Sequence, residues 1–113
     1  MVKHLREDVR SPLNIIFALE SGDIGYLMTG VFPDRSHNVV QGTYVKKGWL
    51  DANLWQGVVP LADLPYVVNP DRGFVVSANN FITTSNIKHG ISHAFTFPHR
   101  VVRISEMLQE TID

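Results

Sequence analysis

The apolar residues of this 113-residue chain come in short runs, and two of these runs flank a glycine-containing turn. Residues 14–19 and 24–29 both contain β-branched and aromatic side chains, and Ser21-Gly22-Asp23 lies between them. Two such runs around a short turn are typical of a β-hairpin. Neither run approaches the roughly 20 apolar residues that a membrane-spanning helix needs. The pattern therefore predicts antiparallel strands and no membrane span.

Both ends of the chain have apolar residues at helical spacing. In residues 1–10 this spacing predicts a short helix, which Ser11-Pro12 ends. After Pro98 the spacing predicts a longer, amphipathic C-terminal helix. The apolar positions of that helix are Val101, Ile104, Leu108 and Ile112.

Proline and glycine punctuate the middle of the chain. They predict a long loop over residues 30–60, a single helical turn over residues 60–65 and a sharp turn at residues 69–73. The apolar run that follows, residues 74–78, predicts a largely buried strand. The order of helix, hairpin, loop, strand and helix indicates an α+β fold with antiparallel pairing.

Composition excludes several classes of protein. The chain has no cysteine, which excludes a disulfide framework and a cysteine-ligated metal site. Ten basic residues against eleven acidic ones give a net charge of −1, so no basic surface for nucleic acid is expected. Charged residues make up 19% of the chain, below the roughly 25% of an average domain. A single domain, or one piece of a larger domain, with faces that meet a partner is therefore predicted.

Few residues indicate chemistry by their spacing alone. His89 and His93 lie four apart, as metal ligands on a helix do, but Gly90 between them and the lack of an acidic partner favour loop residues. The serines lack the Gly-x-Ser-x-Gly and Ser-x-x-Lys contexts of known nucleophiles. No phosphate-binding fingerprint occurs either. We therefore predict no metal ligands and no cofactor-binding residues.

Five segments in order carry a stronger signal. They are residues 14–18, 22–26, 29–35, 55–60 and 69–80, which read NIIFA, GDIGY, TGVFPDR, WQGVVP and NPDRGFVVSANN. Residues 99–104, HRVVRI, close the series before the predicted C-terminal helix. In this order and spacing they resemble the penicillin amidase (penicillin acylase) family of N-terminal-nucleophile hydrolases.

The resemblance implies roles for two residues. In that family a serine at the start of the large chain attacks an amide, with its own α-amino group as the base. Asn79 is similar to the family's oxyanion-hole asparagine, and Arg100 is similar to an arginine that supports the active site. An oxyanion hole needs a neutral donor there, because negative charge develops on the carbonyl oxygen. Without the resemblance, Asn79-Asn80 indicates only a turn, and Arg100 only a cation at a helix start.

The resemblance also implies what this chain lacks. Residues 1–113 are expected to be one partial domain, a segment of the family's αββα fold from the large chain without the nucleophile serine. This polypeptide alone is then expected not to hydrolyse amides. Its exposed sheet edges and apolar faces are expected to meet the remainder of the amidase chain or another chain. A non-catalytic acyl-ligand-binding module and a structural remnant of the family are the alternatives.

The resemblance leaves ligands and compartment less defined. The implied substrate is a small acyl amide, such as a β-lactam with its side chain or an acyl homoserine lactone. Family members bind calcium, but residues 36–43 and 87–92 lack matching ligands, so none is expected here. The family is commonly periplasmic or secreted, whereas the N-terminal residues show no signal peptide, so the compartment stays open. Four aromatic residues are candidates for an acyl pocket, with packing as their alternative use: Phe32, Tyr44, Trp49 and Trp55.

Overall fold

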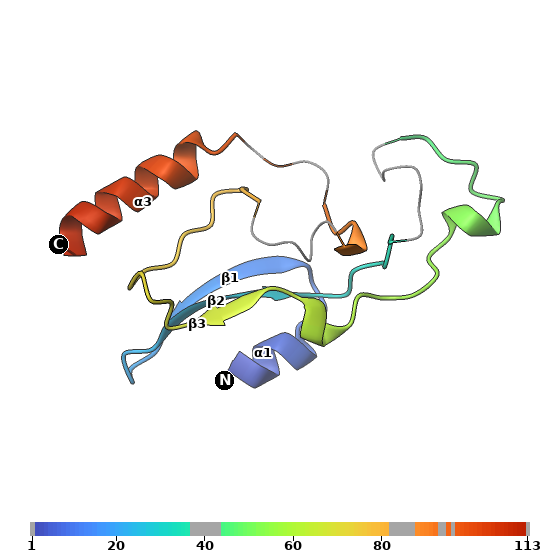
Figure 1. Cartoon of the computed structure of the whole chain (residues 1–113). Coiled ribbons are helices and arrows are strands. Elements are labelled where there is room, and N and C mark those ends of the chain that lie inside the picture. The colour runs from blue at the N-terminus through green and yellow to red at the C-terminus, as the bar shows by residue number, and fades with distance from the viewer. Residues whose placement is uncertain (1, 37–43, 82–87, 93–94, 96, 113) are drawn as a thin grey trace.

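The computed structural model describes residues 2–36, 44–81, 88–92, 95 and 97–112 (Figure 1). It shows a three-stranded antiparallel sheet and a C-terminal helix, which confirms the predicted α+β class. The elements, in chain order, are α1 (Val2–Asp8), β1 (Leu13–Ala18), β2 (Ile24–Thr29), the 3-10 helices η1 (Asp51–Asn53) and η2 (Leu61–Asp63), β3 (Tyr66–Val68) and α3 (His99–Ile112).

The predicted hairpin is confirmed. β1 and β2 pair antiparallel, with Leu13 opposite Thr29 and Ala18 opposite Ile24. The connecting turn places Gly22 at φ 90°, a left-handed conformation that glycine adopts without a steric penalty. β3 then pairs with the other side of β2, so the strand order is β1-β2-β3. The central strand β2 therefore has neighbours on both edges.

The core forms around β2 because that strand is covered from both sides. Leu27 and Thr29 are fully buried, and Thr29 donates its hydroxyl to the carbonyl oxygen of Ser11 at 2.9 Å. Tyr26 and Met28 point the other way along the strand. They form the apolar core with two residues beside η2, Val59 and Leu64.

Gly25, on β2, tolerates no side chain. A Cβ there would collide with the ring of Phe17 and lie 2.5 Å from the carbonyl oxygen of Val67. We expect Gly25→Ala to lower the free energy of unfolding by about 1–3 kcal/mol, because the sheet must shift to make room. Urea denaturation measures this, with Gly48→Ala as the matched control, since nothing lies within 4 Å of a Cβ at that position. Equal stability of the two variants would contradict this account of Gly25.

The predicted strand over residues 74–78 is wrong, and β3 was not predicted. Residues 74–78 form an irregular segment whose two ends are bonded to side chains instead of a neighbouring strand. The carbonyl oxygen of Phe74 accepts from Nε of Arg72 at 2.9 Å, and the N–H of Ala78 donates to Oδ1 of Asn80 at 2.9 Å. The predicted burial of this segment is confirmed at its two ends, since Phe74 and Ala78 are both buried.

Large apolar surfaces are exposed on the described residues, as the sequence predicted. The helix α3 has no buried residue, and its Met107 and Ile112 are 53% and 54% exposed. Figure 1 shows this helix apart from the sheet. On β1, Leu13 and Ile16 are about half exposed. Exposed apolar area of this extent is typical of a surface that meets other protein.

A helix must be both long and apolar to cross a lipid bilayer. None of the helices in the described ranges is both long enough and apolar enough to cross a bilayer.

Candidate functional site

The structure brings Asn79 and Arg100 together. Nη2 of Arg100 donates to the side-chain oxygen Oδ1 of Asn79 at 2.9 Å and to the carbonyl oxygen of Ala78 at 3.0 Å. Arg100 is the second residue of α3, and Asn79 lies in the turn after the irregular segment. A cation in the first turn of a helix is unfavourable to the helix dipole. These two hydrogen bonds explain why an arginine occupies this unfavourable position.

The arginine also fixes which end of the Asn79 amide faces outward. A guanidinium has donors only, so the atom that faces it is the amide oxygen. Nδ2 of Asn79 then lies on the other side of the amide, and it makes no hydrogen bond to any residue in the described ranges. The exposed Asn79 side chain is thus a neutral N–H donor held in one orientation.

The backbone of Asn79 has an uncommon conformation. Asn79 has φ 59°, the left-handed region in which asparagine is one of the few favourable residues other than glycine. Asn80 stabilises this turn by accepting from the N–H of Ala78 and donating from Nδ2 to the carbonyl oxygen of Phe81, both at 2.9 Å. The turn that the pair Asn79-Asn80 indicated in the sequence is therefore present, and the Asn80 side chain closes it.

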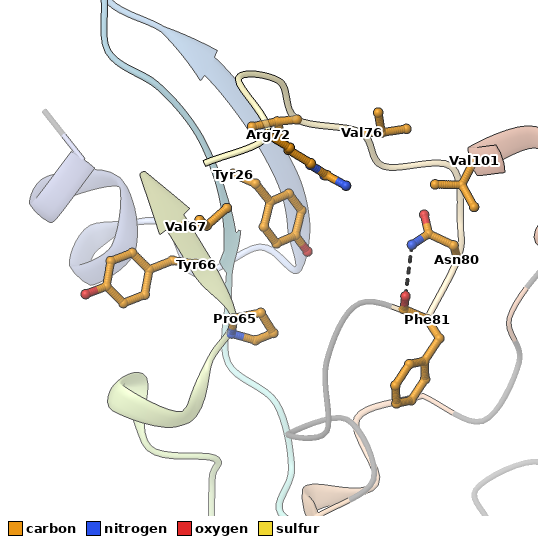
Figure 2. Close-up of a pocket in the computed structure, with 10 residues that line it drawn as sticks. Tyr26, Pro65, Tyr66, Val67, Arg72, Val76, Asn80, Phe81 and Val101 are labelled. Carbon is orange, nitrogen blue, oxygen red and sulfur yellow. Dashed lines mark hydrogen bonds between the residues drawn. The ribbon is translucent and has the colours of Figure 1, made fainter. Parts of the chain in front are cut away.

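Neither Asn79 nor Arg100 lines the pocket of about 380 Å³ that Figure 2 draws, but a chain neighbour of each residue does. Asn80 and Val101, the chain neighbours of Asn79 and Arg100, form part of its wall. Tyr26 lies between the pocket and the core, where its hydroxyl donates to Oδ1 of Asn14 at 2.7 Å. Burial raises the pKa of Tyr26 to about 12, so this tyrosine is neutral at physiological pH. The complete lining is Tyr26, Pro65, Tyr66, Val67, Arg72, Val75, Val76, Asn80, Phe81 and Val101.

The aromatic residues predicted for an acyl pocket are not in this lining. Tyr44, Trp49 and Trp55 belong to the long loop and are 66%, 78% and 65% exposed. Phe32 packs against the apolar core instead. The aromatic residues of the pocket are Tyr26 of β2, Tyr66 of β3 and Phe81, which directly follows Asn80.

His89 has acidic partners that its local sequence does not contain. It is 4% exposed, with Nε2 2.8 Å from Oδ2 of Asp63 and Nδ1 3.4 Å from Oδ2 of Asp34. Lys88 also pairs with Asp63, at 3.1 Å. This cluster links three segments that are distant in the sequence, whereas His93 lies outside the described residues. No group of potential metal ligands occurs within the described ranges.

The same cluster predicts a loss of stability in acid. Hydrogen bonds from Ser36 and then His89 lower the pKa of Asp34, and Lys88 and then His89 lower the pKa of Asp63, both from 3.8. A carboxyl group whose pKa is lower in the folded state contributes stability above its unfolded pKa, and that contribution is lost as pH falls through the folded value. We therefore expect the thermal unfolding midpoint of the chain to fall between about pH 5 and pH 2.

The charge-neutral variant Asp63→Asn tests this. Its midpoint is expected to be lower near neutral pH and to depend less on pH in the acid range. Asp51→Asn is the matched control, because the Asp51 carboxylate makes no hydrogen bond within the described ranges. If Asp63→Asn and the unmodified chain lose stability in acid to the same extent, the cluster does not cause the loss.

Comparison with known proteins gives one family. Residues 2–113 match the family described as penicillin amidase. An acyl-homoserine lactone acylase, QuiP, of Pseudomonas syringae pv. syringae is 32% identical over 95 residues, which are 84% of this chain and 11% of that protein. Penicillin G acylase of Escherichia coli is 31% identical over 107 residues, covering 87% of this chain and 12% of that protein.

A third relative is the penicillin acylase 2 proenzyme of a Pseudomonas species, which is 28% identical over 84% of this chain and 12% of the proenzyme. The chain thus spans about one ninth of the length of the curated relatives it matches. The match to the family covers nearly every residue, including the turn with Asn79 and the start of α3. The chain belongs to the penicillin amidase family.

Proposed function

We propose that this chain acts as a segment of an acylase that hydrolyses acyl amides, in which Asn79 donates a hydrogen bond to the oxyanion. One observation carries the proposal: Arg100 holds the Asn79 amide by its oxygen at 2.9 Å, so that Nδ2 is an oriented neutral donor. Such a donor is most effective when it is already in place before charge develops, because no reorganisation is then needed during the reaction.

The proposed step follows from that geometry. A nucleophilic oxygen from another part of the acylase forms a bond to the amide carbon, and the carbonyl π electrons move to the carbonyl oxygen. Nδ2 of Asn79 donates to that oxygen while it is negatively charged. The intermediate then collapses, the C–N bond breaks, and the amine leaves with the proton that the nucleophile gave up. Water next attacks the ester formed between the acyl group and the nucleophile, which releases the carboxylic acid and returns the proton to the nucleophile. Arg100 touches Asn79 and is a positioning residue in this step.

The relatives support the substrate class. Their names include acyl-homoserine lactone acylases and penicillin acylases. The compounds in these names both carry an acyl group on a small amine. The share of these proteins that the chain spans, 11–12%, supports a partial domain over residues 1–113. The remainder of the acylase is then the partner that covers the exposed apolar faces of α3 and β1. This is the reason to test activity in the complete enzyme.

The test is hydrolysis by the complete acylase that contains residues 1–113. With a fatty-acyl anilide or an acyl homoserine lactone as the substrate, we expect equal amounts of carboxylic acid and free amine. Absence of hydrolysis with both substrates would contradict the proposal. Saturable binding without hydrolysis would support the alternative, an acyl-ligand-binding member of the family.

A further inference from the structure

His89 is a buried, ionisable side chain that the proposed reaction does not use. Each of its two ring nitrogens faces a carboxylate from a different segment. Nε2 lies 2.8 Å from Oδ2 of Asp63, on η2, and Nδ1 lies 3.4 Å from Oδ2 of Asp34, which follows β2. Nδ1 makes no hydrogen bond within the part of the chain that the structure describes. At 3.4 Å its contact with Asp34 is therefore an ion pair of the charged ring and not a well-formed hydrogen bond.

The protonation state of the imidazole decides whether both contacts are favourable. A neutral imidazole has one N–H donor and one lone pair, whereas an imidazolium has two donors. If only Nε2 carries a proton, the lone pair of Nδ1 faces the negative charge of Asp34. The other tautomer places a lone pair 2.8 Å from a carboxylate oxygen of Asp63, which is less favourable still. The doubly protonated ring is the form in which His89 attracts both carboxylates.

Both carboxyl groups stay ionised while a histidine changes its charge. Hydrogen bonds from Ser36, and then His89, lower the pKa of Asp34. Lys88, and then His89, lower the pKa of Asp63. The ordinary pKa of a histidine side chain is about 6.5, well above that of either carboxyl group. The two negative charges are therefore present whether or not the ring is protonated.

Two further cations lie near His89, and they distinguish the two carboxylates. Lys88 pairs with Asp63 at 3.1 Å, and the guanidinium of Arg35 donates to a backbone carbonyl oxygen at 3.4 Å. Among the described residues, neither of these cations pairs with Asp34. Asp63 thus has a positive partner at any charge of the imidazole, whereas Asp34 depends on the charge of His89.

We propose that His89, Asp34 and Asp63 form a pH-sensitive switch. With both ring nitrogens protonated, His89 joins the two carboxylates. When the pH rises, the proton on Nδ1 leaves to the solvent, the contact with Asp34 is lost, and the contact with Asp63 remains. The contribution of the Asp34 contact to stability is therefore present at low pH and is lost as His89 becomes neutral.

The switch holds residues 88–91, which lie along the chain between the turn with Asn79 and the helix α3. Two other contacts of this segment involve no titratable group. The N–H of Arg35 donates to the carbonyl oxygen of His89 at 3.0 Å, and Ile91 packs against the apolar core. We therefore expect loss of the proton to loosen this segment without releasing it from the core.

NMR of the 113-residue chain, with ¹⁵N in both imidazole nitrogens, tests the switch directly. As the pH is raised from about 5 to about 9, Nδ1 of His89 is expected to lose its proton while Nε2 keeps it. The backbone amide signals of Asp34 and Arg35 should change over the same pH range, because the contact with Asp34 is then lost. In Asp34→Asn the proton should leave at a pH lower by roughly 0.5–1 unit, since the negative charge that favours it is absent.

Thermal unfolding measures the effect on stability. Asp34→Asn is expected to lower the midpoint by about 4 °C near pH 5.5, where it removes an ion pair, and by about 1 °C or less near pH 9. Asparagine keeps the side-chain oxygen that accepts from the N–H of Ser36 at 2.9 Å. Asp63→Asn is the matched variant within the cluster and should lower the midpoint at both pH values, because Lys88 loses its partner at either pH. Asp51→Asn, outside the cluster, should change neither midpoint.

Three results would overturn the inference. One is a His89 that loses its proton at the same pH in the unmodified chain and in Asp34→Asn. Another is an Asp34→Asn variant whose midpoint is lowered equally near pH 5.5 and near pH 9. The third is a neutral His89 with its proton on Nδ1, or amide signals of Asp34 and Arg35 that do not follow its titration. This third result needs no substitution, so it applies even if the variants do not fold. None of these measurements involves hydrolysis, so they are independent of the proposed function.

Discussion

Replacement of Asn79 by glycine is expected to lower kcat of the complete acylase by about 10²- to 10³-fold, with a much smaller change in KM. The reason is the loss of one oxyanion donor, which typically costs about 2.7–4 kcal/mol of transition-state stabilisation. The donor interacts more strongly with the negatively charged oxygen than with the neutral substrate, so the loss appears in kcat. Initial rates of anilide hydrolysis over a range of substrate concentrations measure both constants.

Glycine is the informative replacement because Asn79 has φ 59°. Asn79→Ala combines the loss of the amide with backbone strain, whereas Asn79→Gly removes the amide and keeps the left-handed backbone accessible. If the amide is what matters, the two variants should have similarly low kcat. Asn53→Ala, which removes an asparagine from η1, is the control and should keep normal kcat. Near-normal kcat in Asn79→Gly would contradict the role of the side chain.

Replacement of Arg100 by methionine is expected to lower kcat by roughly 10- to 100-fold. Methionine keeps much of the apolar stem but loses the donors to Asn79 and Ala78. Hydrogen bonds to charged groups contribute about 1.5–3 kcal/mol, which corresponds to this range of rates. Without them the Asn79 amide is free to rotate, and Nδ2 is no longer held in one direction.

The neighbouring arginine on the same helix is the control for Arg100. Arg103 lies on an exposed part of α3, where it pairs with Glu106 at 3.1 Å. Exposed pairs of this kind contribute little, so Arg103→Met should keep kcat within about threefold of the unmodified enzyme. Arg100→Lys retains the charge and a donor nitrogen, but not the planar guanidinium, and is expected to recover part of the rate. Equal kcat for Arg100→Met and Arg103→Met would contradict a positioning role for Arg100.

Elements set by local signals could be predicted from the sequence. The hairpin follows from two β-forming runs around Gly22, and α3 follows from the apolar spacing after Pro98. Strand pairing is a non-local property, and there the prediction failed. Residues 74–78 are as apolar as a strand, yet the second edge of β2 is occupied by β3, a β-forming Tyr-Val-Val run of only three residues.

The contacts of the candidate site are also non-local, and local sequence signals did not predict them. Spacing alone gave Asn79 and Arg100 no chemistry, and only the family resemblance selected them from a turn and a helix start. Their hydrogen bond joins residues 21 positions apart, and no periodicity in the sequence encodes it. The partners of His89 were missed for the same reason, since Asp63 and Asp34 approach it from distant segments.

A double-mutant cycle with Asn79→Gly and Arg100→Met tests the central claim most directly. If Arg100 acts through the Asn79 amide, then Arg100→Met should lower kcat by roughly 10- to 100-fold in the unmodified acylase. In the Asn79→Gly background, where no amide remains to be held, the same replacement should have little further effect. Full additivity of the two losses in ΔΔG‡ would contradict the account, because the two side chains would then act independently.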